Sequence, residues 1–235
     1  MAQRWIIPDI HGCLKTLQSL LENMLKVSKH DKLYFLGDYI DRGPNSKGVI
    51  DYLMHLQKEE YEVHFLKGNH EDLCVTAYEA DQKKRLFGKP SEQKEWEAVG
   101  AKATLDSFGV KHPREIPQLY IDWMNACLPY VELEDYILVH AGMNFQIEDP
   151  FEDKHSMMWT RKFKVDFNKS HGKKIIHGHI PVDHSFMNFV VESNDNYDFI
   201  ALDNGVYVTD RPGLGNLMAF NPDTKQLLAQ SNMDL

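Results

Sequence analysis

Five short apolar runs divide this chain, and each ends just before a side chain that can bind a metal ion. The runs cover residues 5–7, 33–36, 63–66, 136–139 and 175–176. The polar side chains that follow them are Asp9 and His11, Asp38, Asn69, His140 and His179. Short apolar runs of this kind are typical of buried strands. Because the carboxyl ends of parallel strands meet at one crevice of an open sheet, we expect these six side chains to share one site.

The first third of the chain alternates strand and helix patterns. Apolar residues recur with helical spacing over 14–25 and again over 49–56, between the first three apolar runs. Asp9, Asp38 and Asn69 follow one another at intervals of about 30 residues, the length of one βαβ unit. This spacing predicts a βαβαβ arrangement whose three polar loops emerge side by side at one edge.

The pattern changes twice in the rest of the chain. Residues from about 78 to 125 are richer in charged and turn-forming residues and have modest helical spacing, which predicts an inserted helical cap. From residue 136 onward short strands dominate, and the last of them are runs at 199–202, 217–220 and 226–229. These strands predict a second, more antiparallel sheet packed on the first.

Composition limits the architecture and the kinds of partner. With 235 residues and 43% apolar content, we expect one α/β domain over residues 1–235. A net charge of -9 argues against a nucleic-acid polymer as partner, because binding the phosphate backbone requires excess lysine and arginine. The three cysteines lie far apart and favour reduced thiols over disulfides. No run approaches the roughly 18 apolar residues of a membrane span, so we expect a cytoplasmic protein without a membrane partner.

Each polar motif also has a plain structural explanation. Residues 9–12 are compatible with an ordinary turn after a strand, and Asp41 and Arg42 with a structural salt bridge. Residues 68–71 are compatible with a helix cap, although a cap does not explain His70. A single histidine near an apolar strand is more often a packed core residue than a ligand. All these explanations would have to hold together, so we favour a shared metal site.

Four motifs occur in a fixed order along the chain. They are Asp-x-His-Gly at 9–12, Gly-Asp-x-x-Asp-Arg-Gly at 37–43, Gly-Asn-His-Glu at 68–71 and His-Ala-Gly at 140–142. This series resembles the signature of the phosphoprotein phosphatase family of calcineurin-like metallophosphoesterases, which includes bacterial-type serine/threonine phosphatases. The resemblance extends from Asp9 to about Phe220. It implies an α/β (α+β) fold, a four-layer β-sandwich of two mixed sheets flanked by helices.

The resemblance also implies a binuclear metal centre. The implied ligands are Asp9 and His11 for the first ion, Asp38 as a bridge between both ions, and Asn69, His140 and His179 for the second ion. Such a mixture of carboxylate, amide and imidazole ligands suits manganese, with iron or zinc as alternatives, better than magnesium or calcium. Two divalent ions about 3.5 to 4 Å apart would hold a hydroxide for in-line attack on phosphorus.

The resemblance assigns the phosphoryl group of the substrate to two arginines. Arg42 and Arg161 would bind its oxygens, and Asn69 would also contact the substrate. A guanidinium fork matches the geometry of phosphate oxygens. The plain alternative for Arg161 is a surface arginine stacked on Trp159.

A proton donor for the leaving group is implied by the same motifs. His70 would be held protonated by Asp41 and would act as the general acid. His177 stands close to the last implied ligand, and the sequence leaves open whether it faces the site or the opposite layer. We therefore do not count His177 among the ligands.

The first functional prediction is a metal-dependent serine/threonine protein phosphatase acting on a phosphorylated protein or a small phosphoester. It depends on Asp41 and Glu71, which match that branch of the family. The alternative is a symmetrical bis(5'-nucleosyl)-tetraphosphate hydrolase, a group that usually lacks the first acid and has Asp in place of the second. A non-catalytic, metal-bound scaffold is the second alternative, although this chain keeps all the implied ligands.

Overall fold

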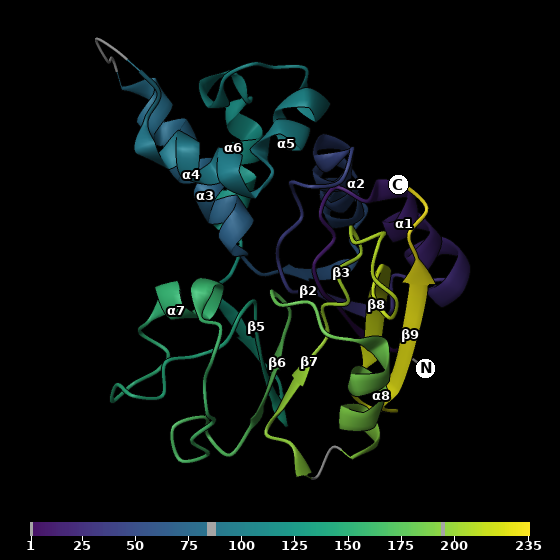
Figure 1. The fold of residues 1–235 in the computed structure, drawn as a ribbon. Helices are drawn as coiled ribbons and strands as arrows, with labels where there is room; N and C mark the ends of the chain where they lie inside the picture. The colour runs from purple at the N-terminus through teal and green to yellow at the C-terminus, as the bar shows by residue number, and fades with distance from the viewer. Residues whose placement is uncertain (1, 84–87, 194–195) are drawn as a thin grey trace.

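The computed structural model of the protein describes residues 2–83, 88–193 and 196–235, and these residues form two β-sheets with helices on their outer sides (Figure 1). The first sheet has the strand order β3-β2-β1-β8-β9, and the second has the order β4-β5-β6-β7. Both sheets contain parallel and antiparallel pairs. The predicted fold class, two mixed sheets flanked by helices, is therefore confirmed.

The first sheet begins with the predicted βαβαβ unit. Its strands are β1 (Arg4–Ile7), β2 (Lys32–Phe35), β3 (Glu62–Phe65), β8 (Asn216–Asn221) and β9 (Gln226–Ser231). The connecting helices are α1 (Leu14–Gln18), its continuation as the π-helix η1 (Ser19–Leu25), and α2 (Ser46–Lys58). Strands β1, β2 and β3 are parallel neighbours, so the loops that follow them emerge side by side, as predicted.

The prediction for the second sheet was wrong in two respects. Its strands are β4 (Tyr130–Glu132), β5 (Tyr136–Val139), β6 (Lys174–His177) and β7 (Phe199–Ala201). Three of these strands are parallel and only β4 is antiparallel, so the sheet is mainly parallel. The final strands β8 and β9 belong to the first sheet, where β8 pairs antiparallel with β1. Strand β1 is apolar on both faces, and its free edge accepts β8 because an unpaired buried edge would leave backbone groups without hydrogen bonds.

Most of the helices gather at one end of the molecule. The segment between the sheets contains α3 (Asn69–Gln82), α4 (Ser91–Val99), α5 (Ala101–Phe108), η2 (Pro113–Glu115) and α6 (Gln118–Ala126), and Figure 1 shows α3 to α6 grouped together. Helix α3 begins at Asn69, so the helical segment starts within the predicted site and not at residue 78. Helices α7 (Lys154–Trp159) and α8 (His184–Glu192) lie beside the second sheet. No helix in the described residues combines the length and apolar character needed to cross a bilayer. The division of the chain into one domain remains a prediction.

Alternating side chains explain how the layers stack. In β1, Ile6 faces the cluster between the two sheets, whereas Trp5 and Ile7 face the outer helices. In β5, Leu138 faces the same inner cluster, and its neighbours Ile137 and Val139 belong to a third cluster on the far side of the second sheet. Successive residues of a strand point to opposite faces, so apolar runs of this kind are buried on both sides. Because both faces of these strands are packed, the strand ends that carry the predicted ligands are held in fixed positions.

Candidate metal centre

The polar loops at the strand ends have an unusual backbone. His11, Asp38, Asp41, Arg42 and His179 all have positive φ angles, between 46° and 70°. Residues other than glycine rarely adopt this left-handed conformation, and each such residue carries strain that the surrounding fold must hold in place. Such strain concentrates at functional sites. Five strained residues from three separate loops therefore mark this edge of the sheets as the candidate site.

Two groups of potential ligands meet at this edge. The first contains His11, Asp38 and His70, and the second contains Asp38, His140 and His179; in each group the ligand atoms lie within 4.8 Å of one another. Asp38 belongs to both groups. Burial raises the pKa of Asp38, but the imidazoles of His140, His70, His11 and His179 outweigh burial and lower it below its usual range. The structure thus brings a shared carboxylate between two sets of imidazoles.

Two of the histidines are held by the backbone. Nδ1 of His11 donates to the carbonyl oxygen of Ile40 at 2.9 Å, and Nδ1 of His140 donates to the carbonyl oxygen of Leu36 at 2.9 Å. The other ring nitrogen, Nε2, then faces Asp38, at 3.7 Å in His11 and 3.5 Å in His140. A backbone acceptor behind the ring is the usual arrangement of a metal-binding histidine, because it fixes the tautomer and the ring orientation.

Asn69 joins the second group through its side-chain oxygen. Oδ1 of Asn69 lies 2.9 Å from Nδ1 of His179 and 3.1 Å from Nε2 of His140. Burial and the nearby His140 lower the pKa of His179 to about 3, so this imidazole is neutral at physiological pH. Nε2 of His179 is buried and has no hydrogen-bond partner among the described residues. The nitrogen of His179 that faces the second group is Nδ1, which also lies 3.2 Å from Nε2 of His140, and a neutral imidazole can bind a metal ion through such a nitrogen.

Asp9 is buried at the same edge but belongs to neither group. Its two carboxylate oxygens accept the backbone N–H of His179 at 3.1 and 2.9 Å. Burial and the neighbouring carboxylate of Asp203 raise the pKa of Asp9 well above its usual value. The ligand role implied for Asp9 therefore remains a prediction.

Asp203 is a site residue that the sequence analysis did not select. It is buried, its Oδ1 accepts the backbone N–H of Gly205 at 2.7 Å, its charge raises the pKa of Asp9, and its other carboxylate oxygen has no partner among the described residues. Burial raises the pKa of Asp203 to about 7. A signal was present, because Asp203 follows the apolar strand β7 just as the other polar residues follow theirs.

Two glycines allow the loops to approach these carboxylates. A side chain at Gly68 would place its Cβ 2.2 Å from Oδ1 of Asp38, and one at Gly178 would place it 2.1 Å from Oδ1 of Asp9. Any other residue would force the carboxylate to move. Together with the two sets of imidazoles and the Asn69 amide, this close packing fits divalent ions of the borderline transition series.

His70 and Asp41 form a buried pair beside the first group. Nδ1 of His70 donates to Oδ2 of Asp41 at 2.7 Å, and both side chains are inaccessible to solvent. Burial lowers the pKa of His70, but Asp38 and the hydrogen bond to Asp41 outweigh it and raise that pKa above its ordinary value. The second nitrogen of the ring, Nε2, faces the ligand group, 3.8 Å from Asp38.

The carboxylate of Glu71 connects the loop after β2 to the start of α3. It accepts backbone N–H groups from Asp38, Tyr39 and Gly68 at distances of 2.8 to 3.0 Å. Residues 68–71 do begin a helix, so part of the helix-cap explanation is correct. Glu71 therefore serves two purposes: it caps the start of α3 through Gly68, and it fixes the backbone of Asp38 in the candidate site.

The two predicted phosphate-binding arginines differ in their surroundings. The guanidinium group of Arg42 lies 3.1 Å from Nε2 of His11, 3.1 Å from Nε2 of His70 and over the ring of Tyr207 at 4.2 Å. Arg161 is exposed. Its charge contributes to lowering the pKa of His179, after burial and His140, which places it near the second group. The role of either arginine towards a substrate remains a prediction.

His177 faces away from the ligand groups. Its ring lies between Phe163 and Phe199, with ring centroids 5.4 and 5.5 Å away. Burial lowers the pKa of His177 to about 4, which keeps the imidazole neutral. The question left open by the sequence is thus answered in favour of the opposite layer.

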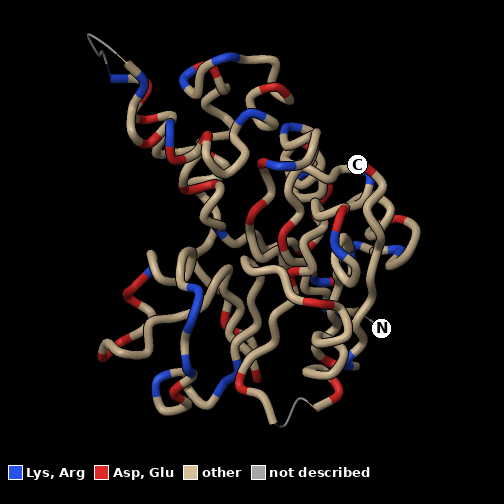
Figure 2. The backbone as a smooth tube through the Cα atoms, viewed as in Figure 1, with Lys and Arg blue, Asp and Glu red and all other residues tan. Residues whose placement is uncertain are grey.

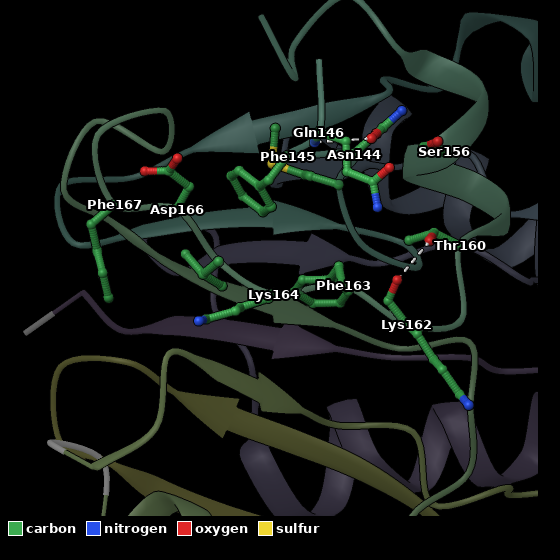
Figure 3. A pocket seen from close by; sticks show the side chains of 12 residues that line it. Asn144, Phe145, Gln146, Ser156, Thr160, Lys162, Phe163, Lys164, Asp166 and Phe167 are labelled. Atoms are coloured by element: carbon green, nitrogen blue, oxygen red, sulfur yellow. Dashed lines mark hydrogen bonds between the residues drawn. The ribbon is translucent and has the colours of Figure 1, made fainter. Parts of the chain in front are cut away.

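A cavity of about 630 Å³ lies between the loop that follows β5 and the segment that follows α7 (Figure 3). It is lined by residues 143–146, Ser156, Thr160 and residues 162–167. The first of these stretches directly follows the His140 motif, and the last directly follows Arg161. Figure 3 shows the ring of Phe163 inside the cavity and the side chains of Lys162 and Lys164 extending outward in opposite directions. The blue segment of the tube that follows α7 in Figure 2 contains these lysines.

The fold and the site are those expected of the class of metal-dependent phosphoesterases. The sequence profile of the family described as calcineurin-like phosphoesterase matches residues 3–208. The chain therefore belongs to the calcineurin-like phosphoesterase family. The narrower prediction of a serine/threonine protein phosphatase is not established by this match.

Several curated relatives are named symmetrical bis(5'-nucleosyl)-tetraphosphatase. The protein from Buchnera aphidicola subsp. Acyrthosiphon pisum (strain Tuc7) is 38% identical over 184 residues, covering 69% of this chain and 58% of the relative. The protein from Coxiella burnetii (strain Dugway 5J108-111) is 30% identical over 142 residues, covering 59% of this chain and 41% of the relative. The matched region thus spans only about half the length of these relatives.

Solved structures with similar folds have more varied descriptions. The structure of a proposed diadenosine tetraphosphatase has a TM-score of 0.65 and 16% identity, covering 97% of this chain and 92% of that one. A serine/threonine phosphatase from Saccharomyces cerevisiae has a TM-score of 0.61 and 15% identity, covering 97% of this chain and 78% of that one. At this level of identity the similarity shows the fold alone.

Proposed function

We propose that this protein hydrolyses dinucleoside tetraphosphates symmetrically, with water as the second reactant and two nucleoside diphosphates as products. The observation that carries the proposal is the name shared by these curated relatives, six of which are at least 30% identical over 142 or more residues. This was the alternative prediction from the sequence. We place it ahead of the protein phosphatase because the comparisons favour it.

The side chains of the site would have two functions, binding of metal ions and binding of the polyphosphate. Asp38 would be shared by two divalent ions, one held with His11 and Asp9 and the other with Asn69, His140 and His179, with manganese as our first expectation and iron or zinc as alternatives. His70 stands beside the first ion and is kept free of metal as the acid. When bound, such ions polarise phosphoryl oxygens and lower the pKa of a water molecule. Arg42, packed against the ring of Tyr207 and beside His11 and His70, presents a cation to the polyphosphate. Arg161 is free to follow a longer anionic chain.

The cavity lined by the stretches that follow the His140 motif and Arg161 supports a substrate larger than a phosphate ester. Its volume of about 630 Å³ falls within the range of small-molecule sites. Phe145 and Phe163 offer aromatic surface, Asn144 and Gln146 offer amides, and Lys162 offers a positive charge at the rim. These groups suit the nucleoside end of a dinucleotide.

The second candidate is a serine/threonine protein phosphatase, and the buried pair of His70 and Asp41 favours it. An alkoxide leaving group is a strong base that requires a proton, whereas a departing nucleoside diphosphate is a weak base that does not. As an imidazolium, His70 carries a proton on Nε2, the nitrogen that faces the ligand groups. The cytoplasmic location that we expect is compatible with both substrates.

The deciding experiment compares the two substrates side by side. The manganese-loaded protein is incubated with diadenosine tetraphosphate and, separately, with a phosphothreonine peptide at equal concentration. Chromatography of the nucleotides distinguishes symmetrical cleavage, which gives only ADP, from asymmetric cleavage, which gives ATP and AMP. Released phosphate reports cleavage of the peptide. We expect ADP as the product and slower turnover of the peptide.

The controls separate the remaining outcomes. Treatment with a chelator should abolish turnover, and added manganese should restore it. Faster turnover of the peptide would overturn the proposal and return the protein phosphatase to first place. If a preparation that binds metal hydrolyses neither substrate, the non-catalytic scaffold is favoured.

A further inference from the structure

We propose that Trp96 and Thr104, from the helical segment, are positioning residues that hold Asp41 so that His70 can donate its proton to the leaving group. This inference rests on the second candidate function, hydrolysis of a phosphomonoester whose alkoxide leaving group needs a proton, and it assigns part of the control of that step to α4 and α5. Trp96 lies 55 residues and Thr104 lies 63 residues beyond Asp41 in the sequence. Neither of them belongs to a motif at a strand end.

Three donors hold the carboxylate of Asp41. Its Oδ2 accepts the ring N–H of His70 at 2.7 Å and the indole N–H of Trp96 at 2.8 Å. Its Oδ1 accepts the hydroxyl of Thr104 at 2.5 Å. All four side chains are almost completely buried, so water does not replace a missing donor easily. The position of this carboxylate therefore depends on α4 and α5 as much as on its own loop.

The hydroxyl of Thr104 uses its full hydrogen-bonding capacity. It donates its one proton to Oδ1 of Asp41 and accepts the backbone N–H of Asp41 at 2.9 Å. It also lies 2.9 Å from Oγ of Ser46, which can donate to it. A hydroxyl has one donor and two acceptor sites, and all three are engaged here. Thr104 thus fixes both the backbone and the side chain of Asp41.

The corner between α4 and α5 lies directly on the same loop. Gly100 joins the two helices with a φ of 123°, and a Cβ at this position would lie 3.1 Å from the backbone nitrogen of Arg42 and 3.5 Å from Cβ of Asp41. The corner therefore packs against both the acid pair and the phosphate-binding arginine. A simple scaffold contact would not require donors aimed at both carboxylate oxygens.

Leaving-group dependence distinguishes positioning of the acid from a general loss of structure. The test uses two aryl phosphates, 4-nitrophenyl phosphate and phenyl phosphate, which differ mainly in how strongly the leaving group needs a proton. The variants Thr104→Val and Trp96→Phe remove one donor each and keep most of the side-chain volume. We expect kcat for phenyl phosphate to fall about tenfold, in the range usual for residues behind a reactive group, and kcat for 4-nitrophenyl phosphate to change much less.

Matched variants complete the design. Thr104→Ser keeps the hydroxyl and should restore the wild-type ratio of the two rates. Ser107→Ala removes another hydrogen bond of α5, to the backbone N–H of Lys47 at 2.8 Å, and should leave the ratio unchanged. The two donor-deleting variants act independently, and thermal unfolding establishes which of them is folded.

The outcomes separate this inference from the proposed function. Equal losses on both esters in folded variants, or no loss, would overturn the positioning role while leaving the phosphoesterase intact. Absence of hydrolysis by the wild-type protein on esters and dinucleotide alike would overturn the proposed function, and the inference with it.

Discussion

The wall of the metal centre built by α3, α4 and α5 is closed by hydrogen bonds, whereas the wall formed by the chain after α7 is open. In the first wall, Asp41 accepts three buried donors and His70 is inaccessible to solvent. In the second wall, Arg161 and Lys162 are exposed, and the neighbouring cavity is open to substrate-sized groups. The contrast suggests that the closed wall performs proton transfer, which requires exact geometry, and that the open wall selects the substrate.

The largest expected effect comes from the residue that both ligand groups share. Asp38→Asn removes the only carboxylate common to the groups with His11 and with His140. We expect kcat to fall by more than the factor of about 100 that marks the upper range for residues behind a ligand, together with a loss of bound metal. Assays of turnover and of metal content by atomic absorption measure both effects.

A buried carboxylate elsewhere provides the control for this change. Asp31 accepts the backbone N–H groups of Gln3 and Ser28 and lies outside the site. Asp31→Asn should reduce stability without changing the metal content. Full metal binding and turnover by Asp38→Asn would show that the two groups do not form one centre.

The next effect tests the chemical role of the closed wall. His70→Gln should lower turnover of a phosphothreonine peptide by about 100-fold, the usual contribution of a general acid. Turnover of diadenosine tetraphosphate should fall less, because its leaving group needs no proton. His64→Gln, on strand β3, is the matched control and should affect neither substrate. Equal losses on both substrates would contradict the role of His70 as an acid.

A smaller effect is expected for the arginine that the closed wall holds. Arg42→Lys keeps the charge but cannot reach the nitrogens of His11 and His70 with a fork. We expect kcat/KM to fall about tenfold, which corresponds to about 1.4 kcal/mol of transition-state binding. Arg114→Lys serves as the control, since Arg114 pairs with Asp81 on the surface. Unchanged kcat/KM in Arg42→Lys would mean that charge alone is sufficient.

The smallest effect belongs to the open wall. Arg161→Gln should raise KM for diadenosine tetraphosphate about threefold with little change in kcat, because an exposed cation contributes little binding energy. Added salt should reduce the difference between wild type and variant. Lys102→Gln, in an exposed pair with Asp106, is the control. A large fall in kcat would place Arg161 in the closed, chemical part of the site.

Much of the fold followed from local patterns. The strand ends that carry Asp38 and His140 were predictable, because an apolar run buried on both faces must stop where polar residues begin. The parallel order of β1, β2 and β3 followed from the spacing of the polar loops. The position of β8 did not, since the spacing of residues within a strand says nothing about which edge it joins.

The candidate site shows the same division. His11, Asp38, Asn69, His140 and His179 meet where the sequence predicted, because each follows its own strand. The sequence predicted that these five residues would meet, since the end of a strand is encoded by neighbouring residues, whereas Asp9, the sixth expected ligand, belongs to neither group. Only the tertiary structure turned His177 away from the site. Its place one residue before Gly178 was compatible with either face.

The tertiary structure also decided which distant residues support the chemistry. Trp96 and Thr104 reach Asp41 from helices with no motif of their own, and Asp203 reaches Asp9 from the end of β7. Contacts of this kind depend on how helices and sheets pack, and packing is determined by the whole set of apolar faces. The local sequence therefore determined which polar side chains end the strands and meet at this edge, and the packed fold determined the groups that orient them.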